Sequence, residues 1–383
     1  MRFGVTWVAA TILGTASAGL SCGMYDPEQA LEELLTEYSE RERSGEPAAS
    51  LAALESRIDA LAGQKDAVFS GLYWHRDLAQ AKQAAEARGL PVLSLRLLGE
   101  LTSDRSCANS RFFRTALYAN EELAAWLREN VVLHWESVRP APVVVIDMGD
   151  GRRIERTITG NSIHWLLLPD GQVVDGFPGL YGPWAFRGAL EPAVETARRA
   201  LERPAHARAA FLRDYHQGLA RTAVELLRAV RDGNPPRAGE AAPLAITKCM
   251  VERPLLAALG DVPGPEDPRW LSSACLYLDR CRLDARSRRL MLRKSPRSQR
   301  TPEAQAALAG RFEELMARDT ARNEGGLRPV LHTWLAAGAG GDLTALNRRV
   351  YAEMFLTPDD DPWLGLAPPG EYAALEEGGL IDR

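Results

Sequence analysis

One cysteine stands where a reactive thiol is expected. Cys107 lies at the start of a helix predicted over 109–118. The first N–H groups of a helix have no intrahelical partner, and together with the helix dipole they favour a thiolate over a thiol. Arg105 and Arg111 add positive charge nearby. Since the thiolate is the nucleophilic form, the sequence predicts thiol chemistry at Cys107.

Two further side chains complete the candidate catalytic set with Cys107 and Arg111. Ser110 stands three residues after Cys107, where a second cysteine would expel a partner held as a mixed disulfide. Because serine cannot do this, a disulfide at Cys107 would need resolution by an outside thiol. His164 is the candidate for tuning the thiol, and the alternative for it is a histidine packed within its strand.

The elements that must position these residues form a small α/β unit. Short apolar runs predict strands at 91–98 and 131–135, and helices are expected at 109–118 and 121–130 between them. Turn residues then separate two strand pairs, at 143–146 with 152–159 and at 164–168 with 172–175. A mixed sheet with helices is therefore expected in the middle of the chain.

The stretch from Cys107 to Leu123 resembles a thioredoxin-like domain of the exported disulfide-interchange type. In that family a strand leads into C-x-x-C, and Arg111 and Tyr118 stand where its basic and aromatic residues would. The run 163–174 resembles the closing hairpin of the same fold. The family's cis-proline would fall at about Ser162, and the pair of strands at 143–159 takes the place of a helix. The resemblance covers roughly residues 70–200.

The resemblance implies an α/β thioredoxin-like central domain, and two functions stay open. One is a thiol redox or thiol-capture role through Cys107, with thiol-disulfide oxidoreductase-like activity. The other is a non-enzymatic binding or scaffolding protein that uses the fold without its chemistry, because a fold does not dictate function.

The first residues have the order of an export signal. Arg2 precedes an apolar run over 3–13 that is too short to span a bilayer, and small residues follow it. Ala16-Ser17-Ala18 fits ordinary signal peptidase, whereas Leu20-Ser21-Cys22 resembles a bacterial lipobox that would make Cys22 the lipidated first residue. We therefore expect a periplasmic or cell-envelope protein, soluble or lipid-anchored.

The 383 residues divide into four predicted parts. These are a signal peptide over 1–21, an acidic helical lead over 22–66, a thioredoxin-like domain over 67–203 and an all-α C-terminal domain over 204–383. Helical periodicity is also expected at 26–62, 75–88, 184–202, 205–232, 269–285, 302–322 and 342–355.

A basic stretch near residue 290 suggests a partner surface. Four arginines share one face of the predicted helix, namely Arg282, Arg286, Arg289 and Arg293. They would suit an anionic surface such as phospholipid heads, and the alternative is a solvated helix balanced by surplus acids. The net charge of −5 and the predicted export both argue against nucleic acid.

The remaining polar residues predict no cofactor and no metal. The chain lacks the phosphate-loop, dinucleotide, zinc-protease and serine-hydrolase motifs. His206, His216 and His332 lie in helical patterns and are expected to be surface or packing residues. Cys275 and Cys281 are too far apart on one helix to pair, so each is either a buried thiol or a partner for Cys249.

Overall fold

The centre of the molecule is a four-stranded mixed sheet. The computed structural model describes residues 26–157, 160–231 (backbone only for 222–231), 273–355 and 357–362. The strands are β1 (Val92–Leu98), β2 (Val132–Arg139), β5 (Ser162–Leu167) and β6 (Val173–Pro178), in the order β2-β1-β5-β6. β1 runs parallel to β2 and antiparallel to β5, and β5 forms a hairpin with β6. The strands predicted here are confirmed.

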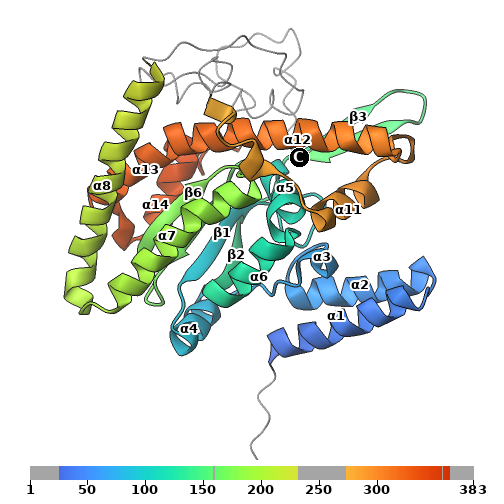
Figure 1. Ribbon diagram of the computed structural model, residues 1–383, viewed down its shortest axis with the longest axis horizontal. Helices are drawn as coiled ribbons and strands as arrows, with labels where there is room; N and C mark the ends of the chain where they lie inside the picture. Colours follow the sequence, from blue (N-terminus) through green and yellow to red (C-terminus); the bar gives the residue numbers. More distant parts are fainter. Residues whose placement is uncertain (1–25, 158–159, 232–272, 356, 363–383) are drawn as a thin grey trace, which may run out of the picture.

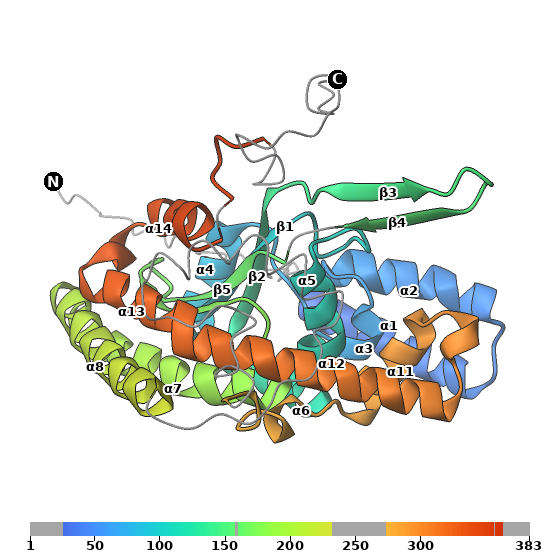
Figure 2. The ribbon, with the colours of Figure 1, turned by 90° about the horizontal axis from the view of Figure 1, so that it is seen from above.

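Helices cover both faces of this sheet. They include α4 (Leu78–Arg88), α5 (Ala108–Phe113), α6 (Glu121–Asn130), α7 (Pro183–Leu201) and α14 (Leu343–Arg349). Figure 2 shows the sheet between α6 and α7 on one side and α4 and α14 on the other. Successive side chains of β5 point to opposite faces of the sheet and contact the helices on each side. His164 packs on Phe186 of α7, whereas the Trp165 indole donates to Asn347 of α14 at 3.0 Å.

The described part of the acidic lead is a pair of helices beside the sheet. Helices α1 (Pro27–Arg43) and α2 (Ala48–Ala62) lie side by side in Figures 1 and 2, and the short α3 (Ala67–Ser70) follows them. The expected helical run breaks at Gly45, whose φ of +78° suits glycine. Leu31, Leu54 and Ile58 form a small core between the two helices.

The C-terminal region is helical and shares its core with the sheet. It contains α8 (Ala205–Arg231), α11 (Ala285–Lys294), α12 (Pro302–Arg322), α13 (Arg328–Ala336) and α14, with single π-helical segments at Asn323–Leu327 and Val350–Met354. One buried cluster extends from Leu72 to Phe355, across the domain boundary expected at 203. Gly176 of β6 shows how close the packing is, because a Cβ there would lie 2.7 Å from Leu331 of α13.

Two predicted helices differ from the structure. The helix expected over 75–88 begins at Leu78, because Asp77 caps it and accepts a hydrogen bond from Gln80 N at 2.8 Å. The helix expected over 269–285 is confirmed only at Ser273 and Ala274 among its described residues before α11 begins; turns and a short 3₁₀ helix at Asp279–Cys281 follow them. The buried carboxylate of Glu313 accepts from the backbone N–H of Leu283 at 3.0 Å, which holds that segment extended.

The predicted hairpin between β2 and β5 is present as a separate two-stranded sheet. Its strands are β3 (Val143–Asp147) and β4 (Arg153–Thr157), and they pair only with each other. Figure 2 shows this arm projecting away from the helices of the body. Within the described ranges, no helix is both long and apolar enough to cross a lipid bilayer.

Candidate functional site

Cys107 occupies the predicted place at the beginning of α5. A loop over 99–106 connects it to β1, and its backbone N–H donates to the carbonyl of Leu98 at 3.0 Å, which closes that loop. The residue is the N-cap of α5, yet it has 0% exposure. The sulfur therefore lies at a helix N-terminus, as a reactive thiol would, but is sealed from solvent in this conformation.

Ser110 is brought against the sulfur, as its spacing predicts. The Cys107 thiol lies 3.5 Å from the Ser110 hydroxyl, and that hydroxyl donates to the Cys107 carbonyl at 2.9 Å. Ser110 is itself fully buried. These contacts fasten the first turn of α5 and hold the thiol in a closed, polar-lined position.

The two arginines flanking Cys107 are engaged with the arm. Arg105 forms an ion pair with Glu155 of β4 at 2.8 Å, and Arg111 donates to the carbonyl of Thr157 at 3.4 Å. Burial lowers the pKa of Arg111, while the nearby Cys107 acts in the opposite direction. The arginines thus connect the cysteine-bearing loop and helix to the base of the hairpin.

A third arginine was not predicted for this site. Arg114 is buried and donates to the carbonyls of Leu101 at 3.2 Å and Ser103 at 2.9 Å. Its guanidinium also lies 3.7 Å from the carboxylate of Asp104. Arg114 therefore fixes the loop that precedes Cys107. Its sequence position inside a helix gave no sign of this role.

His164 is directed to a tyrosine, and no described hydrogen bond joins it to Cys107. Its Nε2 lies 2.7 Å from the Tyr118 hydroxyl, and the ring packs against Phe113 and Phe186. Burial lowers the pKa of His164 to about 3. The imidazole is therefore a neutral core group at physiological pH, in agreement with the packed-histidine alternative.

The chain covers the loop before β5 with its own C-terminal segment. The Tyr351 hydroxyl donates to the carbonyl of Asn161 at 3.3 Å, and the Asn161 amide donates to Thr357 Oγ1 at 3.2 Å. Arg139 at the end of β2 donates to the carbonyl of Pro358 at 3.0 Å. Ser162, which follows Asn161, is buried. Its peptide bond is trans, like every other described peptide bond. A partner reaching this loop would first have to displace the covering segment.

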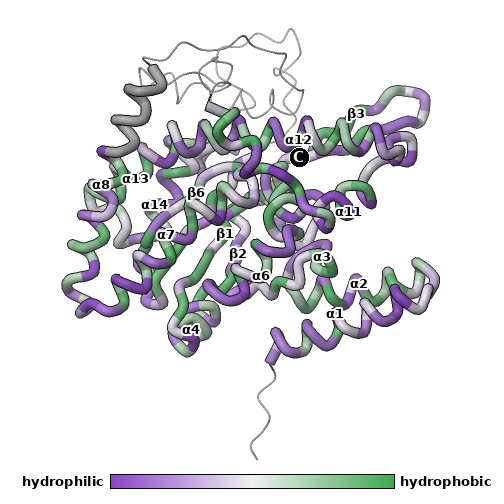
Figure 3. Tube along the Cα trace, viewed as in Figure 1, coloured by the Kyte–Doolittle hydropathy of each residue, from purple (hydrophilic) through white to green (hydrophobic). Residues whose placement is uncertain are grey.

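The projecting arm carries most of the exposed apolar surface. Of eight large hydrophobic side chains that are exposed among the described residues, six belong to the arm, with exposures of 36–55%: Val143, Val144, Val145, Ile146, Met148 and Ile154. Figure 3 shows β3 among the hydrophobic segments of the chain. Clustered apolar exposure of this kind marks an interaction surface.

The basic face of the C-terminal region is occupied by contacts within the chain. Arg282 pairs with Glu313 at 2.9 Å, and Arg286 pairs with Glu121 at 2.9 Å. Arg289 lies over the ring of Phe69, and Arg293 pairs with Glu55 at 2.8 Å. Only the last three belong to α11, because Arg282 precedes that helix.

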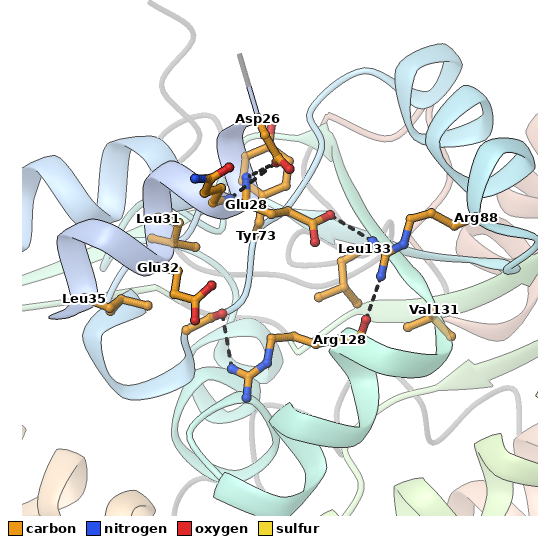
Figure 4. A pocket seen from close by; sticks show the side chains of 12 residues that line it. Asp26, Glu28, Leu31, Glu32, Leu35, Tyr73, Arg88, Arg128, Val131 and Leu133 are labelled. Carbon is orange, nitrogen blue, oxygen red and sulfur yellow. Dashed lines mark hydrogen bonds and ion pairs between the residues drawn. The ribbon is translucent and has the colours of Figure 1, made fainter. Parts of the chain in front are cut away.

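A hollow between α1 and the sheet edge is lined by arginines that are likewise paired within the chain. Figure 4 shows Glu28 directed to Arg88, and both Arg88 and Arg128 directed to backbone carbonyls. The Glu28–Arg88 distance is 2.9 Å, and Arg88 donates to the carbonyl of Arg128 at 2.8 Å. These groups join the acidic lead to the α/β region and leave no cation in the hollow without a partner.

Several predicted features lie outside the described residues, including the export signal, Cys22 and Cys249. Compared with models of protein families, with curated proteins and with solved structures, the chain gave no match. Its function is therefore inferred from geometry and chemistry.

Proposed function

We propose that this chain is a non-enzymatic binding and scaffolding protein of the cell envelope, built on a thioredoxin-like fold. The observation that carries the proposal is the sealed sulfur of Cys107, with 0% exposure and a serine in place of a second thiol. A thiol exchanging disulfides must be reached in line by another sulfur, so a closed sulfur favours a structural role. Export and the lipid anchor at Cys22 rest on the order of residues 1–22.

The thioredoxin-like part of the proposal is supported by the order of the elements. Strand β1 leads directly to a cysteine that begins a helix, the parallel strand β2 follows, and the antiparallel β5–β6 hairpin closes the sheet. His75 adds a parallel bridge to His134 at the outer edge of β2. This is the order of elements that the resemblance implies, except that the β3–β4 arm takes the place of the family's helix between β2 and β5.

The arm is the element that we assign to binding. Ile146 pairs with Ile154 across the two strands, and Val144 and Met148 flank Ile146 on the same face. A two-stranded hairpin with an exposed apolar face is only marginally stable alone in water. Its extended shape is held at the base by Thr157, whose hydroxyl donates to the carbonyl of Ser106 at 2.7 Å.

The outer edge of β3 is suited to accept another strand. The Met148 N–H donates to the Arg152 carbonyl, so residues 144, 146 and 148 pair with β4. Val143, Val145 and Asp147 therefore direct their main-chain groups away from β4. Natural proteins usually protect such an edge with charged residues, yet β3 has only Asp147, at its end.

The occupant that we propose for this edge is the β3 strand of a second copy. In antiparallel pairing centred on Val145, Val143 of one copy would lie opposite Asp147 of the other. No two like charges would then face each other. The arm as a whole is neutral, because its three acidic and three basic residues balance: Asp147, Asp150 and Glu155 against Arg152, Arg153 and Arg156. Two copies can therefore approach without net repulsion.

Thiol accessibility tests the non-enzymatic role. The folded protein is treated with iodoacetamide near neutral pH, and alkylation of the Cys107 peptide is followed by mass spectrometry. Glu129→Cys, on the exposed face of α6, provides an accessible thiol for comparison. We expect Cys107 to react more than about tenfold more slowly than this reference, because reaction requires local opening. Labelling as fast as the reference would overturn the proposal.

A thiol redox or thiol-capture role is the second candidate, and one observation favours it. The sulfur lies at the N-terminus of α5 with the Arg111 guanidinium nearby, the position at which the sequence predicts thiol chemistry. The same alkylation experiment separates the candidates, since rapid and selective labelling of Cys107 is the result expected for this role.

The oligomeric state tests the arm. Light scattering after size-exclusion chromatography should give a mass that rises to a dimer as concentration increases. Ile146→Glu places a charge on the apolar face and should leave a monomer, whereas Leu276→Glu, at an exposed leucine outside the arm, should behave like wild type. A wild-type protein that stays monomeric up to millimolar concentration would exclude self-association.

A further inference from the structure

Three potential metal ligands converge at the edge of the sheet opposite β2. Asp175 lies on β6, His216 on α8 and His332 on α13, three elements that lie together in Figure 1. All three side chains are buried, and one ligand atom from each lies within 4.8 Å of the others. The separations along the sequence are 41 and 116 residues, so no motif could have indicated the cluster.

The distances within the cluster fit donors around one ion. The Nδ1 atoms of His216 and His332 are 3.1 Å apart, and His332 Nδ1 lies 3.8 Å from Asp175 Oδ1. Zinc holds nitrogen and carboxylate oxygen at about 2.0–2.2 Å, so two donors on a tetrahedral ion lie about 3.3–3.5 Å apart. The observed separations lie on either side of this value, and small side-chain shifts would equalise them.

The structure assigns to Asp175, His216 and His332 a binding site for a divalent transition-metal ion, with Zn²⁺ the best match. The two imidazole nitrogens are borderline donors, and together with one carboxylate oxygen they suit zinc more than calcium or magnesium, which prefer oxygen ligands alone. Water would complete the tetrahedral coordination. The site is independent of the function proposed above.

The carboxylate is oriented as a metal ligand requires. Its Oδ2 atom accepts from Arg328 at 2.8 Å and from the Tyr215 hydroxyl at 3.1 Å. Its Oδ1 atom accepts from Gly176 N at 2.7 Å and faces His332. Such outer contacts fix the orientation of ligands in metal sites. Arg328 therefore contacts the oxygen that faces away from the imidazoles.

The charges around the cluster favour an added cation. Arg328 also donates to Glu324 at 3.2 Å, so one guanidinium serves two carboxylates. With both imidazoles neutral, the group Asp175, Glu324 and Arg328 has a net charge of −1. A bound cation would offset this negative charge, which the single guanidinium leaves uncompensated.

A metal here would fasten the helical region to the sheet. Helices α8 and α13 pack on each other, and each contributes one histidine ligand, His216 and His332. Strand β6 contributes the carboxylate of Asp175. An ion bound only by the folded protein stabilises it by mass action. We therefore expect the thermal unfolding midpoint to rise with Zn²⁺ and to fall after chelation.

The experiment uses the full chain purified without a polyhistidine tag. Calorimetric titration with Zn²⁺ should give one equivalent bound, and Co²⁺ should give visible absorption bands of a tetrahedral site. His216→Gln and His332→Gln should each weaken Zn²⁺ binding by more than about 100-fold. His206→Gln, at an exposed histidine of the same helix as His216, should bind like wild type.

Two results would overturn the site. One is wild-type protein that binds neither Zn²⁺ nor Co²⁺ at millimolar concentration, which would mean that the two imidazoles simply hydrogen-bond to each other. The other is His216→Gln or His332→Gln protein that is folded by circular dichroism and still binds with wild-type affinity. The Co²⁺ spectrum of wild type decides the question even where a variant does not fold.

Discussion

The hydroxyl of Tyr118 and the imidazole of His164 lie 2.7 Å apart in the core, between the π-helical turn after α5 and strand β5. The Nδ1 atom of His164 makes no hydrogen bond among the described residues, and aromatic rings surround it. A histidine placed to tune a thiol would face that thiol. Here the imidazole instead satisfies a buried tyrosine, and this arrangement gives the protein a defined response to acid.

Acid should destabilise the protein because its buried histidines resist protonation. Burial lowers the pKa of His164 and of His134 to about 3, against an ordinary value of 6.5. Between these values the unfolded state binds more protons, so stability is lost as pH falls from 6.5 toward 3. Each histidine contributes about 1.4 kcal/mol per pH unit. Urea unfolding over this range measures the slope.

The matched variants for this prediction are His164→Gln and His206→Gln. The first removes one buried titrating group and should reduce the slope, while its amide can still bond to Tyr118. The second changes an exposed histidine and should leave the slope as in wild type. Equal slopes for all three proteins would show that His164 is protonated in the folded state.

Replacing Arg114 by lysine should loosen the loop before Cys107. One guanidinium nitrogen, Nη1, donates to the carbonyls of both Leu101 and Ser103, while Nη2 lies 3.7 Å from the Asp104 carboxylate; a lysine ammonium has only one nitrogen for all of these contacts. Hydrogen exchange in residues 99–106 should quicken, with a loss of stability of about 1–3 kcal/mol. Arg105→Lys, in an exposed ion pair on the same loop, should change neither quantity. Unchanged exchange in Arg114→Lys would contradict the anchoring role.

Local patterns were enough to predict the sheet, because its strands are short apolar runs bounded by turn residues. The run 91–98 became β1, and Pro169-Asp-Gly171 became the β5–β6 turn with Gly171 at φ +97°. The position of Cys107 at a helix N-terminus followed from the same reasoning. Its burial did not, because burial depends on residues far away in sequence, such as Thr157, whose hydroxyl donates to the carbonyl of Ser106 beside Cys107.

Long-range contacts also explain the other differences. Periodicity alone favoured a helix over 269–285, but the buried carboxylate of Glu313 on α12 competes for the backbone at Leu283. His216 and His332 each have an ordinary helical pattern, and only the packing of α8 on α13 brings their rings together. A single sequence gives no signal for a pair of this kind.

Removing the charge of Glu313 should destabilise the C-terminal region. This buried carboxylate accepts from Arg288 at 2.7 Å and from Arg282 at 2.9 Å, in addition to the backbone at Leu283. Glu313→Gln keeps the shape but removes the carboxylate that pairs with Arg288 and leaves Arg282 only Asp279, at 3.7 Å; we expect a loss of about 1–3 kcal/mol. Glu314→Gln changes the exposed neighbour and should be neutral. The prediction would be contradicted if the two variants unfolded at the same urea midpoint.

Adding a methyl group at Gly182 tests the close approach of the C-terminal region to α7. A Cβ at this position would lie 2.2 Å from the sulfur of Cys281 and 2.6 Å from its Cα, so the backbone would have to move. We expect Gly182→Ala to lower stability by about 1–3 kcal/mol. Cys281→Ala in the same chain should restore part of this loss. Gly310→Ala, where the Cβ meets open space within α12, should instead stabilise by about 0.5–1 kcal/mol through helix propensity. If Gly182→Ala unfolds at the wild-type urea midpoint, the segment around Cys281 does not pack on the start of α7 as described.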